Sequence, residues 1–128
     1  MKEEEDIGAI YTKKEDIDRI LSKIKEFSYD QLKKNRHYEE SLWTKDTDEN
    51  KLKEVYEEFY RIKQVFYRIR KGGYNSYDFH YELDDGTFAI ISINLDSKPP
   101  EIINGFFSST NFKNFMKAIS KRYWKKII

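Results

Sequence analysis

The sequence contains no cysteine and only two histidines, His37 and His80. Without cysteine, the chain has no disulfide framework, no thiolate ligand for a metal and no cysteine nucleophile. Neither histidine belongs to an HExxH motif or a similar cluster, and P-loop, GxGxxG and GxSxG motifs are also absent. We therefore expect no metal site and no cofactor.

Long apolar runs are absent as well. The longest is FAIISINL, residues 88–95, which is far too short to span a bilayer. A secretory signal peptide starts with basic residues and continues with apolar ones, whereas this chain starts with MKEEEDIG. We therefore expect a cytoplasmic protein without a membrane partner.

Charged and aromatic residues are abundant instead, at 37% and 16% of the chain, which is enough large apolar surface for a folded core. A length of 128 residues predicts one domain, 1–128, with residues 1–11 as a mobile acidic N-terminus. Residues 1–60 carry 12 basic and 17 acidic side chains, and residues 61–128 carry 12 basic and 6 acidic ones. The protein is therefore electrically polarised along its sequence.

Helical patterns occupy the first half of the chain. Thr12 and Glu15 have capping-box spacing, and apolar residues then recur on one helical face: Ile17, Ile20, Leu21, Ile24 and Phe27. Ser28 could cap a second, shorter helix through about residues 37–42, or the first helix could run on, and the sequence leaves both open. A longer helix is predicted up to Gly72-Gly73, because apolar residues alternate spacings of three and four: Leu52, Val55, Phe59, Ile62, Phe66 and Ile69.

The apolar period changes to that of a strand after Gly73. Apolar and polar residues alternate over 77–83, and Asp84-Asp85-Gly86 turns the chain into a second strand over 87–95. A two-residue loop would mix apolar and polar side chains on both faces, whereas a three-residue loop with Gly86 left-handed leaves one face almost wholly apolar. The predicted register therefore pairs Leu83 with Thr87, Tyr81 with Ala89, Phe79 with Ile91 and Tyr77 with Ile93.

The predicted fold is α+β, with the element order α-α-β-β-β-α. Residues 101–107 are predicted to form a third strand, and residues 108–111 supply N-cap candidates for a C-terminal helix. The inward positions of that helix are Phe112, Phe115, Met116, Ile119, Tyr123 and Ile127. We expect an antiparallel three-stranded β-meander whose apolar face is covered by the helix around residues 52–69 and by the N- or C-terminal helix.

Two surfaces remain once core positions are assigned. Tyrosines and basic residues share one flank of the predicted helix before Gly72: Tyr56, Tyr60, Lys63, Tyr67, Arg70 and Lys71. On the last helix, three lysines at i, i+4 spacing and a tryptophan lie away from the apolar stripe: Lys113, Lys117, Lys121 and Trp124. Such surfaces suit nucleic-acid bases and phosphates or a protein interface. They can equally be the rim of the core and a complement to the helix dipole.

These features favour a small non-enzymatic binding protein that docks on a protein partner through both surfaces. Compact proteins without catalytic motifs from low-GC bacteria and phages include antitoxins, immunity proteins and anti-CRISPR proteins, and the scarcity of alanine suits such AT-rich genomes. The alternative is a nucleic-acid-binding protein or a metal-independent ribonuclease toxin, with His80 and Glu82 as catalytic residues on a polar strand face. Toxins of that kind resemble this chain only in outline, because strands 87–95 and 101–107 carry no basic residue.

Overall fold

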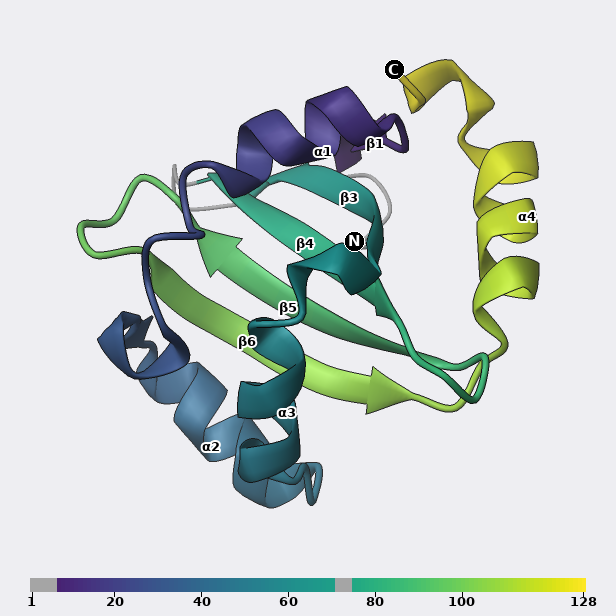
Figure 1. The fold of residues 1–128 in the computed structure, drawn as a ribbon. Coiled ribbons are helices and arrows are strands. Elements are labelled where there is room, and N and C mark those ends of the chain that lie inside the picture. Colours follow the sequence, from purple (N-terminus) through teal and green to yellow (C-terminus); the bar gives the residue numbers. More distant parts are fainter. Residues whose placement is uncertain (1–6, 71–74) are drawn as a thin grey trace.

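The computed structural model describes residues 7–70 and 75–128 (Figure 1). Along the chain its elements are β1 (Ile7–Tyr11), α1 (Lys14–Leu21), η2 (Tyr29–Gln31), β2 (Lys33–Lys34), α2 (Arg36–Thr44), α3 (Glu49–Tyr56), η3 (Phe59–Arg61), β3 (Ile62–Ile69), β4 (Asn75–Glu82), β5 (Phe88–Asn94), β6 (Glu101–Ser108), α4 (Phe112–Arg122) and η4 (Trp124–Lys126). The α+β class is correct. The predicted three-stranded meander and the order α-α-β-β-β-α are wrong, because the strands form a six-stranded mixed sheet.

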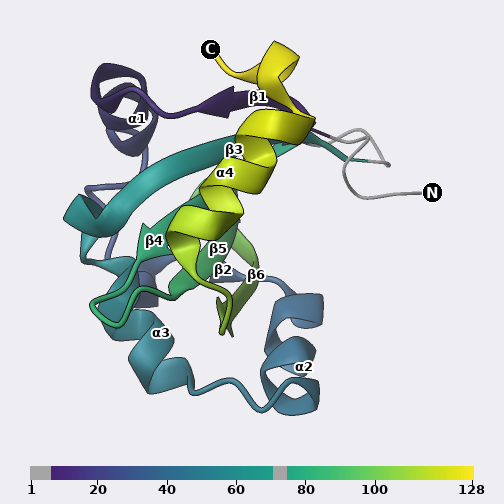
Figure 2. The ribbon, with the colours of Figure 1, turned by 90° about the vertical axis from the view of Figure 1, so that its right-hand side faces the viewer.

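The sheet has the strand order β1-β3-β4-β5-β6-β2, and all neighbours are antiparallel except β2 and β6. Helices lie on both sides of it (Figures 1 and 2). Buried side chains of α1, α2 and α3 pack with one face, which contributes Val65, Phe79 and Ile91 to the main core. On the other face, α4 packs through Ile119 against Phe66 and β1 in a smaller cluster.

The long helix predicted over residues 52–69 is the main error. Only α3 is helical there, and residues 62–69 form strand β3 between β1 and β4. β3 is buried on both faces, because Val65 faces the main core and Phe66 faces α4. A strand with apolar residues on both faces does not alternate cleanly, so its spacings of three and four imitate a helix. Residues Gly72 and Gly73, predicted to end the helix, lie outside the described residues.

The hairpin register predicted from the sequence is confirmed. Tyr77 pairs with Ile93, Phe79 with Ile91 and Tyr81 with Ala89. The Leu83 N–H donates to the Thr87 carbonyl at 2.9 Å, and Gly86 has φ 87°, a left-handed conformation that glycine adopts without strain. Residues on the apolar side of this register form part of the main core, as its one-sided pattern required.

The segment after α1 and residues 7–11 both form defined secondary structure. Ser28 and Gln31 form a capping box around the short η2, and α2 starts anew after Asn35, whose side chain accepts a hydrogen bond from the His37 N–H at 2.8 Å. Residues 7–11 of the predicted N-terminal segment form the edge strand β1, while residues 1–6 lie outside the described residues. None of the helices in the described part has the length and apolarity of a membrane span.

Candidate functional site

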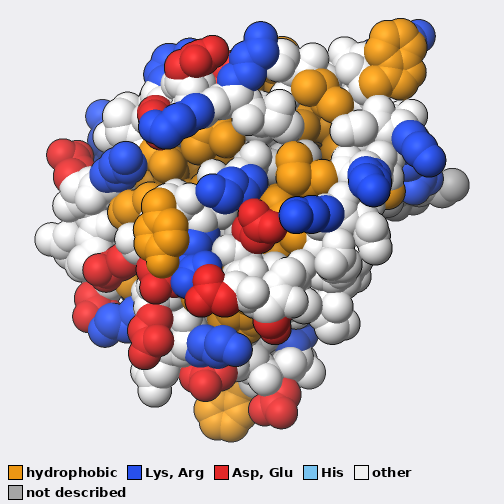
Figure 3. All heavy atoms as spheres, turned by 45° about the vertical axis from the view of Figure 1, so that its right-hand side comes forward, with side chains coloured by type: hydrophobic (Ala, Val, Ile, Leu, Met, Phe, Trp, Pro, Cys, Tyr) orange, Lys and Arg blue, Asp and Glu red, His pale blue; other side chains and the backbone are white. Residues whose placement is uncertain are grey.

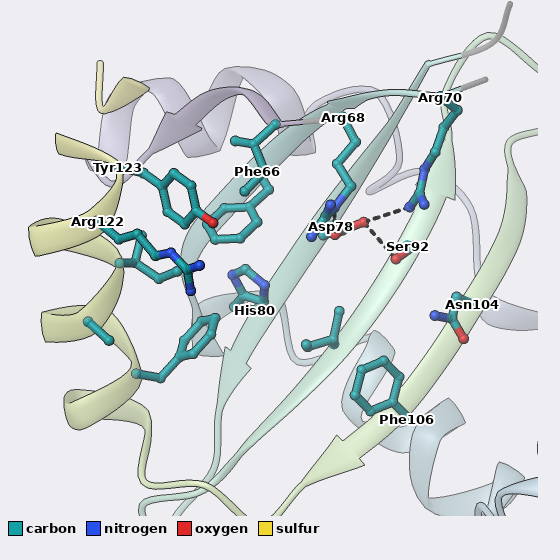
Figure 4. Close-up of a pocket in the computed structure, with 15 residues that line it drawn as sticks. Phe66, Arg68, Arg70, Asp78, His80, Ser92, Asn104, Phe106, Arg122 and Tyr123 are labelled. Atoms are coloured by element: carbon teal, nitrogen blue, oxygen red, sulfur yellow. Dashed lines mark hydrogen bonds and ion pairs between the residues drawn. The ribbon is translucent and has the colours of Figure 1, made fainter. Parts of the chain in front are cut away.

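A cleft of about 350 Å³ lies between α4 and the sheet face opposite α1 and α3 (Figure 4). Alternate residues of β3 and β4 form its floor, because successive side chains of a strand point to opposite faces. The alternation that places Val65 and Phe79 in the main core therefore places Phe66 and His80 in the cleft. The polar side chains of its lining are Arg68, Arg70, Asp78, His80, Ser92, Asn104, Arg122 and Tyr123.

A network of charged side chains centres on Asp78, which is 5% exposed. The Asp78 carboxylate accepts hydrogen bonds from Arg68 Nε, from Ser92 Oγ at 2.7 Å and from Arg70 Nη2 at 3.4 Å. Arg70 Nε also donates to Ser76 Oγ at 2.9 Å. Charge-assisted hydrogen bonds in a partly desolvated site hold both guanidinium groups in fixed positions on the cleft floor.

His80 lies on the same sheet face as Asp78 and is 1% exposed. Its ring stands edge-on to Phe66 at 4.6 Å and to Phe115 at 5.4 Å between ring centroids, and its Nδ1 lies 3.2 Å from the amide nitrogen of Gln64. Burial lowers the pKa of His80 from 6.5 to about 4, with a smaller opposing effect of Asp78. His80 was expected on a polar strand face, but it is buried because α4 covers that face.

The buried imidazole predicts a pH dependence of stability. The unfolded chain binds a proton at His80 near pH 6.5, whereas the folded protein binds one only near pH 4. The contribution of neutral His80 to the free energy of unfolding is therefore fully present above pH 6.5 and is lost as the pH drops towards 4. From pH 7.5 to pH 5 the loss from this group is about 2 kcal/mol in free energy of unfolding. Urea unfolding of wild type and His80→Gln at both pH values measures it, and equal pH dependence in the two proteins would contradict the burial of a neutral His80.

The predicted tyrosine and arginine flank does not exist as one surface. Tyr56 is fully buried and donates to the Phe27 carbonyl at 2.9 Å, while Tyr60 is 69% exposed beyond the end of α3. Tyr67 is on β3 and points to the same sheet face as Val65, opposite the cleft. Lys63 is exposed at a register irregularity of β3 between Ile62 and Gln64, whereas Arg70 lines the cleft. Lys71 lies outside the described residues. The flank was derived from a helical wheel, and the chain there is a strand.

The C-terminal residues form a second candidate surface, here called the C-terminal basic surface: Lys113, Lys117, Lys121, Trp124 and Lys125. All five are exposed, and the Lys125 ammonium lies 5.5 Å from the centre of the Trp124 ring. Trp124 is on η4, two residues beyond the end of α4. In Figure 3, Lys and Arg side chains gather with hydrophobic ones on the right-hand part of the view, where no acidic side chain is visible.

The turn that carries Trp124 is anchored on both sides. Before it, Tyr123 packs with Phe66 and Ile119 in the smaller core cluster. After it, Ile127 forms a bridge with Ile10, and the Ile128 N–H donates to the Ile10 carbonyl at 2.9 Å. Trp124, which is 64% exposed, therefore lies on a segment that the edge strand β1 holds in place.

Most of the cleft residues were missed from the sequence. Had residues 62–70 been identified as a strand, the period of two would have placed Arg68 and Arg70 on the face of Phe66. The antiparallel pairing of Arg68 with Ser76 and of Phe66 with Asp78 would then have brought the two arginines to Asp78. Glu82, the second predicted catalytic residue, is at the end of β4 and is not among the cleft residues.

No protein-family model, no curated protein and no solved structure matches this chain. Within the described ranges, no group of three or more histidine, aspartate or glutamate side chains is arranged to hold a metal ion. The geometry of the cleft and of the C-terminal basic surface is therefore the basis for a functional assignment.

Proposed function

We propose that this chain is a non-enzymatic binding protein that docks on an acidic protein surface through its C-terminal basic surface. In this role it inhibits or regulates its partner by covering part of it, as antitoxins, immunity proteins and anti-CRISPR proteins do. The observation that carries the proposal is Trp124, a large aromatic side chain that is 64% exposed on an anchored turn just after α4, with the Lys125 ammonium 5.5 Å from its ring centre.

Charge supports an acidic partner. Residues 102–128 contain six Lys and Arg and no Asp or Glu, so nothing in that segment neutralises the row on α4. Lys113, Lys117 and Lys121 follow at i, i+4 spacing and lie on one side of the helix. Complementary charge of this kind raises the rate of association and excludes partners with a basic surface.

Trp124 supports a protein partner. Tryptophan is enriched among the residues that dominate the binding energy of protein interfaces, where it acts as a central anchor. Because the turn is fixed by Tyr123 and Ile127, little conformational freedom is lost when Trp124 is buried by a partner.

Nucleic-acid binding has less support from the geometry. The aromatic platform proposed for base stacking included Tyr56, which is fully buried. Arg68 and Arg70 bind the Asp78 carboxylate. His80, the proposed general base, is 1% exposed, and its pKa is lowered by burial to about 4, which is a poor match to catalysis near neutral pH.

Charge reversal tests the proposal. We expect the triple substitution Lys113→Glu, Lys117→Glu, Lys121→Glu to weaken binding to poly-L-glutamate, a model of an acidic protein surface, at least tenfold at 0.15 M salt. The reason is that local charges dominate when the Debye length is about 8 Å. In a Trp43→Phe background, Trp124 emission should report burial of its ring by poly-L-glutamate.

The matched control has the same charge change on α1 and the segment around it: Lys13→Glu, Lys23→Glu, Lys25→Glu, all exposed positions. This control should bind poly-L-glutamate within about threefold of wild type, since the C-terminal basic surface is intact. Equal weakening in both triple variants would show that only net charge matters. Tighter binding of single-stranded RNA than of poly-L-glutamate, with Trp124 quenched, would favour a nucleic-acid partner.

A further inference from the structure

The cleft beneath α4 contains polar groups that the proposed function does not use. It opens on the inner side of α4, whereas Lys113, Lys117 and Lys121 are exposed on that helix and are not part of its lining. A concave site with apolar walls and a few converging polar groups is the usual form of a small-molecule site. The atoms left available in it define the kind of ligand.

Most of the hydrogen-bond acceptor sites on the acidic side chain of the cleft are already used by protein donors. Asp78 is the acidic residue of its described lining, and its carboxylate already accepts from Arg68, Arg70 and Ser92. A carboxylate has about four lone-pair sites. With three donors in place and 5% exposure, Asp78 has little capacity to bind a cationic or donor group of a ligand.

Hydrogen-bond donors remain available at three places. Arg70 uses one N–H for Ser76 and one for Asp78, out of the five that a guanidinium carries, and its side chain is 24% exposed. The Asn104 Oδ1 accepts from the Gly105 N–H at 3.0 Å, so the amide NH₂ of Asn104 is the end left for another partner. Tyr123 Oη is buried, has no hydrogen-bond partner in the structure and points into the cleft (Figure 4).

Apolar side chains complete the lining. Ile90 and Phe106, paired across β5 and β6, are partly exposed and lie on the cleft floor, and Phe115 and Ile119 of α4 form the wall. The volume of about 350 Å³ is at the lower end of the range for ligand pockets, which suits a molecule with a single ring. His80 is neutral above about pH 4 and adds no charge of its own at neutral pH.

We propose that this cleft binds a small molecule that carries an oxyanion, a carboxylate or a phosphate, on a flat apolar body. The oxyanion accepts hydrogen bonds from Arg70 and Asn104, and the apolar body lies on Ile90 and Phe106. The Tyr123 hydroxyl donates to a second acceptor at the other end of the molecule. This site is separate from the C-terminal basic surface and does not depend on the proposed function.

Calorimetric titration with three single-ring probes tests the proposal: phenyl phosphate, benzoate and the neutral benzyl alcohol. At least one of the two anions should bind at least tenfold more tightly than benzyl alcohol. A preference for phenyl phosphate assigns a phosphate ligand, and a preference for benzoate assigns a carboxylate ligand.

Substitutions in the cleft lining test whether the anion binds in the cleft. Arg70→Gln should weaken anion binding at least tenfold, whereas Arg36→Gln, the same change at an exposed position of α2, should leave it unchanged. Asn104→Asp, which replaces a donor by a negative charge without touching the Asp78 network, should abolish it. Tyr123→Phe should weaken binding several-fold while the melting temperature does not fall, because the hydroxyl it removes has no partner in the unliganded fold.

Three results would overturn the proposal. They are no binding of either anion at millimolar concentration, equal affinity for benzyl alcohol and for both anions, or anion binding by folded Arg70→Gln and Asn104→Asp proteins as tight as by wild type. The variant with Lys113, Lys117 and Lys121 replaced by glutamate should still bind the anion, which separates this site from the proposed partner surface.

Discussion

Replacing Asp78 by alanine is expected to lower the free energy of unfolding by about 3–5 kcal/mol, because removal of one partner of a buried ion pair leaves the other charge uncompensated. Asp78 accepts from Arg68, Arg70 and Ser92 on the sheet face beneath α4. Without it, the guanidinium groups of Arg68 and Arg70, whose side chains are 13% and 24% exposed, lose this carboxylate as a partner on the cleft floor. Urea unfolding of the purified variant measures the loss.

Asp84→Ala is the matched control. Asp84 also pairs with an arginine, Arg61, at 2.9 Å, but its side chain is 90% exposed. Exposed ion pairs add little to stability, so this variant should unfold almost as wild type does. If Asp78→Ala and Asp84→Ala behaved alike, the Asp78 network would be solvated and the cleft would lack its rigid floor.

Replacing Phe66 by alanine should cost about 3–5 kcal/mol of the free energy of unfolding, as is typical for a buried phenylalanine. Phe66 is 3% exposed and belongs to the cluster that attaches α4 to β1 and β3. Its ring also lies 4.6 Å from that of His80, so the cavity left by the substitution would open the cover over the imidazole. Thermal and urea unfolding both report the change.

Phe59→Ala distinguishes the strand from the predicted helix. In a helix over 52–69, Phe59 and Phe66 would lie on the same buried stripe, so both substitutions would be equally damaging. In the structure Phe59 is only partly buried on η3, against Tyr56 at 5.3 Å. Phe59→Ala should therefore cost clearly less than Phe66→Ala. Equal losses would support the helix and contradict β3.

The parts of the fold with a local signal could be predicted from the sequence. The hairpin register followed from Gly86 and from the need for one apolar face, and both are local properties of residues 77–95. The strand 101–107 and the N-cap of α4 at Asn111 were likewise within the predicted ranges. Strand β3 could not be separated from a helix, because its pattern depends on α4 covering the second face. Strands β1 and β2 gave no signal of their own and form only by pairing with β3 and β6.

Each candidate surface could be predicted only where the secondary structure of its residues was assigned correctly. Lys113, Lys117, Lys121 and Trp124 are exposed because the apolar stripe that defined their position is local to the C-terminal segment. The tyrosine flank failed because it depended on a helix that does not form. The cleft needed tertiary information, since Arg70 directly follows β3 while Asp78 and Asn104 come from β4 and β6.

Photo-crosslinking from position 124 shows directly whether Trp124 contacts a protein partner. A benzophenone amino acid replaces Trp124 in the full chain in its native host, and the same replacement at Trp43, which is 88% exposed on α2, is the control. We expect one discrete protein adduct from position 124, lost when Lys113, Lys117 and Lys121 are glutamate, and no such adduct from position 43. An RNA adduct from position 124, or the same adducts from both positions, would show that Trp124 is not the anchor for a protein partner.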